Sequence, residues 1–160
     1  MTKEPEVHLV RKGSSMIYQD EQDWAISLKE DGFSSIQISY ILDGFREGLD
    51  YSAVKIFAKK ELSQEQMRLI SYELKSVWNY HSWQDKYEQV EYFAKPEYSH
   101  SCLSIIYKQL KDNVNFEKVK FYATPDRAAK QLVKMGKLAK KYRNLENFKA
   151  QLALVILENS

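Results

Sequence analysis

The chain has 160 residues, which is long enough to bury a sizeable core without disulfides or bound metals. Hydrophobic residues make up 44% of it and charged residues 29%, a composition that excludes an intrinsically disordered chain. The single cysteine, Cys102, excludes an internal disulfide and fits a reducing compartment. No apolar run is long enough to cross a membrane, and residues 1–14 lack the apolar stretch of a signal peptide, so we expect a cytoplasmic protein.

Charge is unevenly distributed along the chain, although the net charge is only +2. Residues 13–52 contain eight acidic and two basic side chains, whereas residues 127–145 contain seven basic side chains and no acidic one. Such an asymmetry indicates a charged surface for a partner, although a solvated face is the commoner reason for a run of charge.

The N-terminal part is expected to form a flexible arm over residues 1–14 and a helix over residues 15–33. Trp24, Ile26 and Leu28 supply the apolar content of that helix. Gly32 follows them at the place where a helix needs a left-handed residue as its C-terminal cap.

A short motif, V-x-x-[F/Y]-A, occurs three times, at residues 54–58, 90–94 and 119–123. Start signals for longer helices lie 29, 36 and 29 residues apart, at Ser34, Ser63, Ser99 and Ala128. Repetition at this period is typical of stacked helical repeats. It predicts repeats at residues 34–62, 63–98 and 99–127, and a divergent repeat with a C-terminal cap at residues 128–160.

Apolar residues recur at the same distances from the starts, chiefly +4, +7, +11, +15, +20 and +23. The first four distances step by three and four residues, which places the side chains on one face of a helix of about four turns. A break near residues 48–50, or its equivalent, and a shorter helix with the motif complete each repeat. We therefore predict an all-α fold in a single domain, a short array of tandem helix pairs with a capping helix at each end.

The second repeat is seven residues longer than its neighbours, and the extra residues lie within residues 78–89. Insertions in repeat arrays often form the binding face, and this one is rich in the tryptophan and tyrosine that dominate protein interfaces. We predict a partner-binding site at Tyr80, Trp83, Asp85, Lys86 and Tyr87. The alternative is that these side chains pack as ordinary core. Trp78 is the one most expected to do so, because it stands at the core distance of +15.

A second candidate surface is a basic segment near the C-terminus. Its six members are Lys130, Lys134, Lys137, Lys140, Lys141 and Arg143. Four of the lysines step by four, three and four residues, so they form one stripe along a helix. The stripe is suited to the phosphates of a nucleic acid or to an acidic protein surface, and the remaining alternative is a plain solvated face.

The last predicted helix spans residues 147–158 and contains six consecutive apolar residues, from Leu152 to Leu157. A helix that is apolar around most of its circumference has to be buried. It is expected to be covered either inside the domain or in a homodimer, because an exposed apolar patch of that size would promote aggregation.

Residues for catalysis or ligand chemistry are sparse. The five glycines are scattered, so the sequence has no glycine-rich phosphate loop. Only three histidines occur, and His100 lies two residues from Cys102, on a different face of a helix. Cys102 is expected to be a small core residue. We predict a protein that is not an enzyme and has no catalytic residues, no metal ligands and no cofactor.

Two stretches resemble a known tandem helical repeat. Residues 44–58 followed by residues 65–70, and also residues 93–99, are similar to the pattern G-L-x-x-G-L-[S/D]-x-x-x-V-x-x-[F/Y]-A-[D/K]-P-x-[F/Y]-[S/D]-x-x-Q-M-x-x-I. The resemblance covers residues 33–127. It departs from the pattern at Lys60, where proline is usual, in the insertion, and at residues 113–115, where G-L-[S/D] is usual.

Such repeats are typical of uncharacterised proteins from Gram-positive bacteria, their phages and their conjugative elements, and the family has no established catalytic residues. The resemblance implies a mobile-element protein in the cytoplasm of a bacterial host. Small proteins that disable host defence machinery are common among such cargo. The expected function is therefore a non-catalytic inhibitor of anti-CRISPR or anti-restriction type, which contacts a host protein or nucleoprotein effector directly. The alternative is an accessory protein that binds nucleic acid with the lysine stripe.

Overall fold

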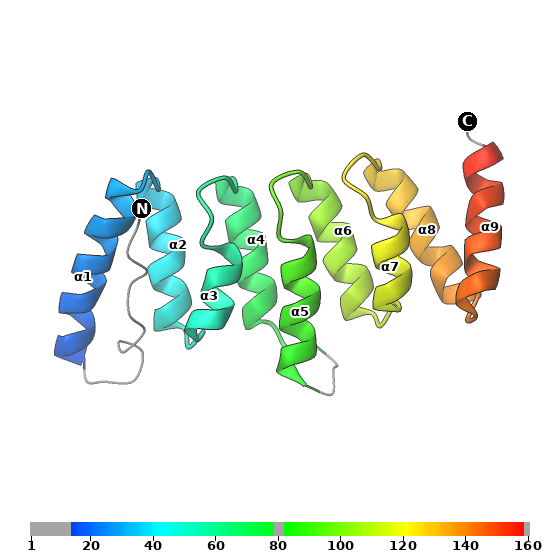
Figure 1. The fold of residues 1–160 in the computed structure, drawn as a ribbon. Helices are drawn as coiled ribbons and strands as arrows, with labels where there is room; N and C mark the ends of the chain where they lie inside the picture. The colour runs from blue at the N-terminus through cyan, green and yellow to red at the C-terminus, as the bar shows by residue number, and fades with distance from the viewer. Residues whose placement is uncertain (1–13, 79–81, 159–160) are drawn as a thin grey trace. The chain divides into compact units, whose positions relative to one another are not determined.

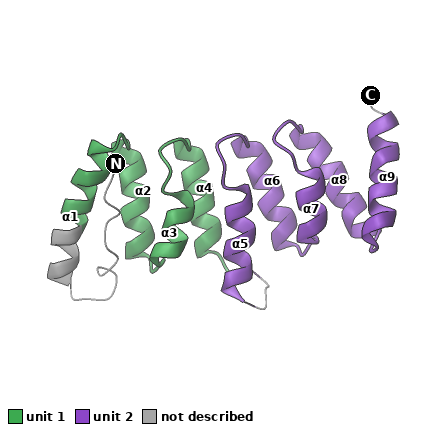
Figure 2. Cartoon of the chain, viewed as in Figure 1, with its two compact units in different colours: residues 1–77 green, residues 78–160 purple. Residues whose placement is uncertain are grey.

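The computed structural model describes the backbone of residues 14–78 and 82–158, and within these residues the fold is all-α (Figure 1). The predicted fold class is thus confirmed. The chain divides into two compact units, one that ends at Val77 and one that begins at Trp78 (Figure 2). The prediction that the whole chain is a single domain stays a prediction.

The described part of the first unit contains α1 (Ser14–Glu30), α2 (Ser35–Arg46), α3 (Tyr51–Phe57) and α4 (Gln64–Lys75). The second unit contains α5 (Trp83–Phe93), α6 (His100–Lys111), α7 (Phe116–Tyr122), α8 (Ala129–Lys141) and α9 (Leu145–Glu158). Within the first unit α2 packs against α1, α3 and α4; within the second, α6 packs against α5, α7 and α8, and α9 packs against α8. Residues 1–13 of the predicted arm lie outside the described residues.

Serine N-caps begin three of the long helices, at the predicted starts Ser34, Ser63 and Ser99. Each hydroxyl accepts a hydrogen bond from the backbone N–H three residues later, at 3.1 to 3.2 Å. Ala128 is the N-cap of α8 and has no side-chain oxygen to accept such a bond. It keeps only the return bond of a capping box, in which its N–H donates to Gln131 Oε1 at 2.9 Å.

Turns with a left-handed residue end α1, α2 and α6. Gly32, Gly48 and Asn113 have φ angles of +99°, +98° and +67°, which confirms the cap predicted at Gly32. The next residue in each turn donates its N–H to a carbonyl five residues back, at 2.9 to 3.1 Å. The residues at +15, Leu49 and Val114, are buried as predicted, but they lie in this turn rather than on the helix. The prediction of four helical turns is therefore wrong, because the left-handed residue ends each helix after 12 residues and returns the chain to the core.

The V-x-x-[F/Y]-A motif ends each short helix in the same way. Its valine and its aromatic ring are at most 1% exposed in all three copies, which are Val54 and Phe57, Val90 and Phe93, and Val119 and Tyr122. Its alanine is the central residue of an inverse γ-turn, with φ between −77° and −85° and ψ between 66° and 74°. The N–H after the alanine donates to the carbonyl before it at 2.8 to 3.0 Å. One motif thus anchors the core and ends the helix.

The third residue of a long helix can tie that helix to the loop before the next repeat. Gln37 Nε2 donates to the carbonyl oxygens of Lys60 and Leu62, at 3.1 and 2.9 Å. Cys102 stands at the same place in its own repeat, and its Sγ donates to the carbonyl oxygen of Arg127 at 3.4 Å. Cys102 is buried, which confirms that it is a small core residue.

Helix α8 approaches α6 closely at Gly136, where the side chain of Gln109 fills the contact. Gln109 Nε2 donates to the Leu132 carbonyl at 2.8 Å, and its Oε1 accepts the hydroxyl proton of the fully buried Tyr122. A Cβ atom at Gly136 would lie 2.3 Å from Gln109 Nε2. The amide has to move if that atom is added, and the buried hydroxyl then loses its acceptor.

Gly136→Ala is therefore expected to be about 1–3 kcal/mol more destabilising in the wild-type background than in a Gln109→Ala background, because only the former has these hydrogen bonds to lose. The higher helix propensity of alanine, about 1 kcal/mol, is common to both backgrounds and cancels in the comparison. Urea denaturation of the four proteins measures the difference. Equal effects of Gly136→Ala in both backgrounds would contradict this role of Gln109.

Tyr98 couples stability to alkaline pH. Its hydroxyl donates to the Ala123 carbonyl at 2.8 Å, and burial, followed by nearby Tyr92, Glu97 and Asp126, raises the pKa of Tyr98 from 10.0 to about 12. The folded chain holds this proton more tightly than the unfolded chain, so the free energy of unfolding falls as pH rises from about 10 to about 12. We expect a shallower fall for Tyr98→Phe, measured by urea denaturation across that window. Parallel curves would exclude Tyr98 as the source.

Helix α9 is buried along one side only. Phe148 and Leu152 are at most 1% exposed, whereas Leu154, Ile156 and Leu157 are 52%, 37% and 70% exposed. Burial of the whole apolar segment inside the domain is therefore wrong, because α9 packs on α8 while these three side chains stay exposed. The homodimer alternative stays a prediction.

Candidate functional site

The insertion in the second repeat adds a helical turn to α5 and lengthens the connection between α4 and α5. Helix α5 has 11 residues, whereas α3 and α7 have seven each, so four of the seven extra residues lengthen the helix. The remaining three lengthen the connection at residues 76–82, which is four residues long at residues 47–50 and 112–115. Tyr80, one of the predicted binding residues, lies outside the described residues.

Trp83 opens the extra turn of α5. Ser82 is the N-cap, and its Oγ accepts the N–H of Asp85 at 3.2 Å, which holds the first turn in place. The Trp83 ring is 56% exposed and meets the half-buried ring of Tyr87 edge to face, with 5.0 Å between centroids. Asp85 is exposed beside them. The chain thus presents a large aromatic ring to solvent at a site that the shorter repeats lack.

Lys86 is the predicted binding residue that the fold buries. It is 7% exposed, and its Nζ lies 6.0 Å from the centroid of Trp78 and 5.8 Å from that of Tyr87. Trp78 is 6% exposed, as expected for a residue at +15. Lys86 therefore lies within cation–π range of both rings and contributes little surface of its own.

Tyr92 extends the aromatic surface from α5 to α7. It is 40% exposed, and its ring lies 5.7 Å from that of Phe116 on α7. Lys95 Nζ and Lys120 Nζ lie 4.6 and 5.6 Å from the Tyr92 centroid, within the range of cation–π attraction. A hydrogen bond to Glu117 is the main cause that raises the pKa of Lys120. The surface therefore alternates rings with both signs of charge.

A shallow hollow of about 460 Å³ runs along α5 between the exposed rings. Its lining residues are Trp83, Gln84, Tyr87, Glu88, Glu91 and Tyr92, which we call the α5 aromatic face. Rings with polar tips and neighbouring carboxylates bury a large area at low entropic cost and can also form hydrogen bonds. Sequence reasoning missed Tyr92, although its place between the two buried positions of V-x-x-[F/Y]-A indicates that it points outward.

The basic residues predicted near the C-terminus are exposed. Lys130, Lys134, Lys137, Lys140 and Lys141 lie on α8, and Arg143 follows it. In the part of the chain that the structure describes, none of the six forms an ion pair. The buried side of α8 carries Leu132, Met135 and Ala139, each at most 3% exposed. The positive charge of this helix is therefore available to a partner.

The described residues were compared with the patterns of metal sites and of paired nucleophiles. No three histidine, cysteine or acidic side chains there gather in a way that could hold a metal ion. His100 is exposed and Cys102 is buried, so the two do not form a pair. None of the described helices is long and apolar enough to span a bilayer.

No protein-family model, no curated protein and no solved structure matches the chain.

Proposed function

We propose that this chain is a non-catalytic binding protein that contacts another protein through the α5 aromatic face. The observation that carries the proposal is the exposure of Trp83 at the start of an extra helical turn. An exposed tryptophan is costly to leave in water, and it becomes favourable when a partner covers it. The two shorter repeats end their second helices with the same motif and do without this turn. The turn is therefore an addition for binding rather than a requirement of folding.

The charge around the rings favours a protein over a nucleic acid at this face. Glu88 and Glu91 lie between the aromatic residues, where they would repel phosphates. Lys95 and Lys120 lie over the neighbouring ring of Tyr92 and balance those carboxylates. A mixed pattern of this kind suits the rim of a protein interface, where opposite charges set the orientation of the partner.

The repeat resemblance supplies the class of partner in this proposal. Proteins with such repeats are typical of mobile elements of Gram-positive bacteria, whose small cargo proteins often disable host defence. We therefore propose a host defence protein as the target, either a restriction enzyme or a CRISPR effector, which the chain inhibits by occupying its surface.

Affinity capture tests the proposal. Tagged wild-type chain and a Trp83→Ala variant are incubated with a Gram-positive lysate, with and without nuclease, and the bound proteins are identified by mass spectrometry. We expect one stoichiometric protein that survives nuclease and is lost from the variant. Equal recovery of that protein by both chains, or recovery of nucleic acid alone, would count against the proposal.

A second candidate function is nucleic-acid binding by α8, favoured by its exposed lysines without ion pairs among the described residues. Lys134, Lys137 and Lys141 would contact phosphates and release counterions. The triple change to glutamate is then expected to abolish binding to DNA or RNA, and salt titration of wild type should show a linear fall of log affinity. If the triple variant still binds DNA or RNA as weakly as the wild type does, this function is excluded.

A further inference from the structure

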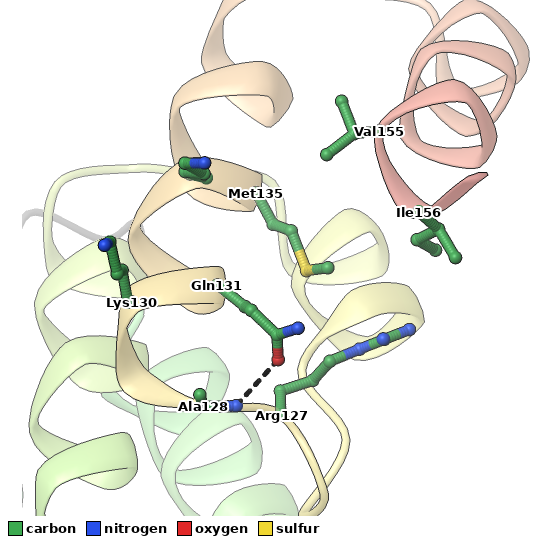
Figure 3. Close-up of a pocket in the computed structure, with 8 residues that line it drawn as sticks. Arg127, Ala128, Lys130, Gln131, Met135, Val155 and Ile156 are labelled. Carbon is green, nitrogen blue, oxygen red and sulfur yellow. Dashed lines mark hydrogen bonds between the residues drawn. The ribbon is translucent and has the colours of Figure 1, made fainter. Parts of the chain in front are cut away.

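A groove separates the N-terminal half of α8 from the last turns of α9, both in the second unit. It has a volume of about 500 Å³ and is distinct from the α5 aromatic face. Figure 3 shows Met135 of α8 facing Val155 and Ile156 of α9 across it. Ile156 is 37% exposed, so an apolar wall remains open to solvent here.

Arg127 is the distinctive polar residue of this groove. It precedes α8 and extends below the groove toward α9 (Figure 3). Its Nε donates to the Tyr122 carbonyl at 3.4 Å, which fixes the direction of the half-buried side chain. The neighbouring Asp126 carboxylate accepts the Thr124 hydroxyl, and in the described residues it forms no ion pair with Arg127. The two terminal nitrogens of the guanidinium are therefore available to a planar acceptor such as a carboxylate.

The charged side chains that line the groove are all basic and favour a positive potential, which the Asp126 carboxylate beside Arg127 partly offsets. Lys130 and Lys134 line it together with Arg127, and no acidic residue does. The first turn of α8 adds to this potential, because Ala128 cannot cap its N–H groups with a side-chain oxygen. Two copies that met groove to groove would oppose like charges, so a symmetric dimer is disfavoured here. An acidic partner is the complementary one.

We propose that this groove binds an amphipathic protein segment that carries a carboxylate about one helical turn from an apolar side chain. The apolar side chain lies between Met135, Val155 and Ile156, and the carboxylate forms a paired hydrogen bond with Arg127. Helix-in-groove recognition has this form, with a few apolar anchors for affinity and flanking charges for orientation. The site is separate from the α5 aromatic face and does not depend on the function proposed for that face.

Fluorescence anisotropy of the full chain with a designed peptide tests this site. The probe is a labelled helical peptide of about 15 residues with leucines three and four residues apart and glutamates beside them. Two control peptides replace the glutamates by lysine or the leucines by glutamine. We expect saturable binding of the acidic amphipathic peptide and at least a tenfold weaker affinity for either control.

Variants of the chain assign the binding to the groove. Arg127→Gln and Ile156→Asp are each expected to weaken peptide binding by at least tenfold, while Lys108→Gln, on α6 outside this groove, changes it less than threefold. Ile156 is partly exposed, so Ile156→Asp keeps the test valid even if Arg127→Gln perturbs the fold. Absence of saturable binding, or equal binding of the leucine-free peptide, overturns the proposal. A single-stranded oligonucleotide that binds more tightly and is insensitive to Ile156→Asp also overturns it, in favour of nucleic acid.

Discussion

Phe93→Ala is expected to lower the free energy of unfolding by about 3–5 kcal/mol, because it empties a fully buried aromatic position. The Phe93 ring meets three others, those of Tyr92, Tyr98 and Phe116, with centroids 4.8, 5.6 and 6.3 Å away. These contacts connect α5 to the loop before α6 and to α7. The loss is measured as a shift of the urea denaturation curve followed by circular dichroism.

Tyr92→Ala provides the matched control, since Tyr92 precedes Phe93 on the same helix and is 40% exposed. Its removal costs surface contacts and two cation–π interactions but leaves no cavity, so we expect a loss of about 1 kcal/mol or less. Similar losses for the two variants would contradict the assignment of Phe93 to the core.

Trp83→Ala is expected to weaken the binding of the captured partner by about 2–4 kcal/mol, the range of a tryptophan hot spot. The change should leave the free energy of unfolding nearly unaltered, because Trp83 is 56% exposed and is the first residue of α5. Isothermal titration of the purified partner with wild type and variant measures the effect.

Tyr72→Ala is the control for that titration. Tyr72 is 60% exposed on α4 in the first unit. Its substitution therefore removes an exposed ring of similar size from a different helix. We expect the partner to bind this variant as it binds wild type. An unchanged affinity of Trp83→Ala, or an equal loss in Tyr72→Ala, would show that the α5 aromatic face is not the interface.

The repeated elements could be predicted from sequence because local rules determine them. Serine before an amphipathic segment fixed the starts at Ser34, Ser63 and Ser99, and the spacing of apolar residues identified the buried face of each helix. Gly48 and its counterpart Asn113 share the left-handed conformation, although only one of them is glycine. Asparagine tolerates that conformation, so the departure from the repeat pattern leaves the turn intact.

Features that depend on packing between distant segments could not be predicted. Lys118 would be assigned to the surface by its charge, yet it is 5% exposed and its Nζ donates to the carbonyl oxygens of Ala139 and Tyr142 at the end of α8. Its long aliphatic stem fills apolar space while the ammonium group caps the helix. Burial of Lys86 next to the rings of Trp78 and Tyr87 has the same origin. Neither position carries a local signal that distinguishes it from the exposed lysines of α8.

The candidate surfaces were only partly accessible from sequence for the same reason. The insertion drew attention to Trp83, but the contribution of α7 to that surface depends on the contact of Tyr92 with Phe116. The groove beside Arg127 depends on the way α9 packs on α8, which leaves Ile156 open. The sequence predicted a basic surface from the lysines of α8 and Arg143, and Arg127 was not among its predicted site residues.

Hydrogen–deuterium exchange of the chain with and without its captured partner tests the central claim most directly. If the α5 aromatic face is the interface, the partner slows exchange in α5 and α7, and α8 exchanges as it does in the free chain. Protection confined to α8, with α5 and α7 unchanged, would contradict the claim and assign binding to the basic helix.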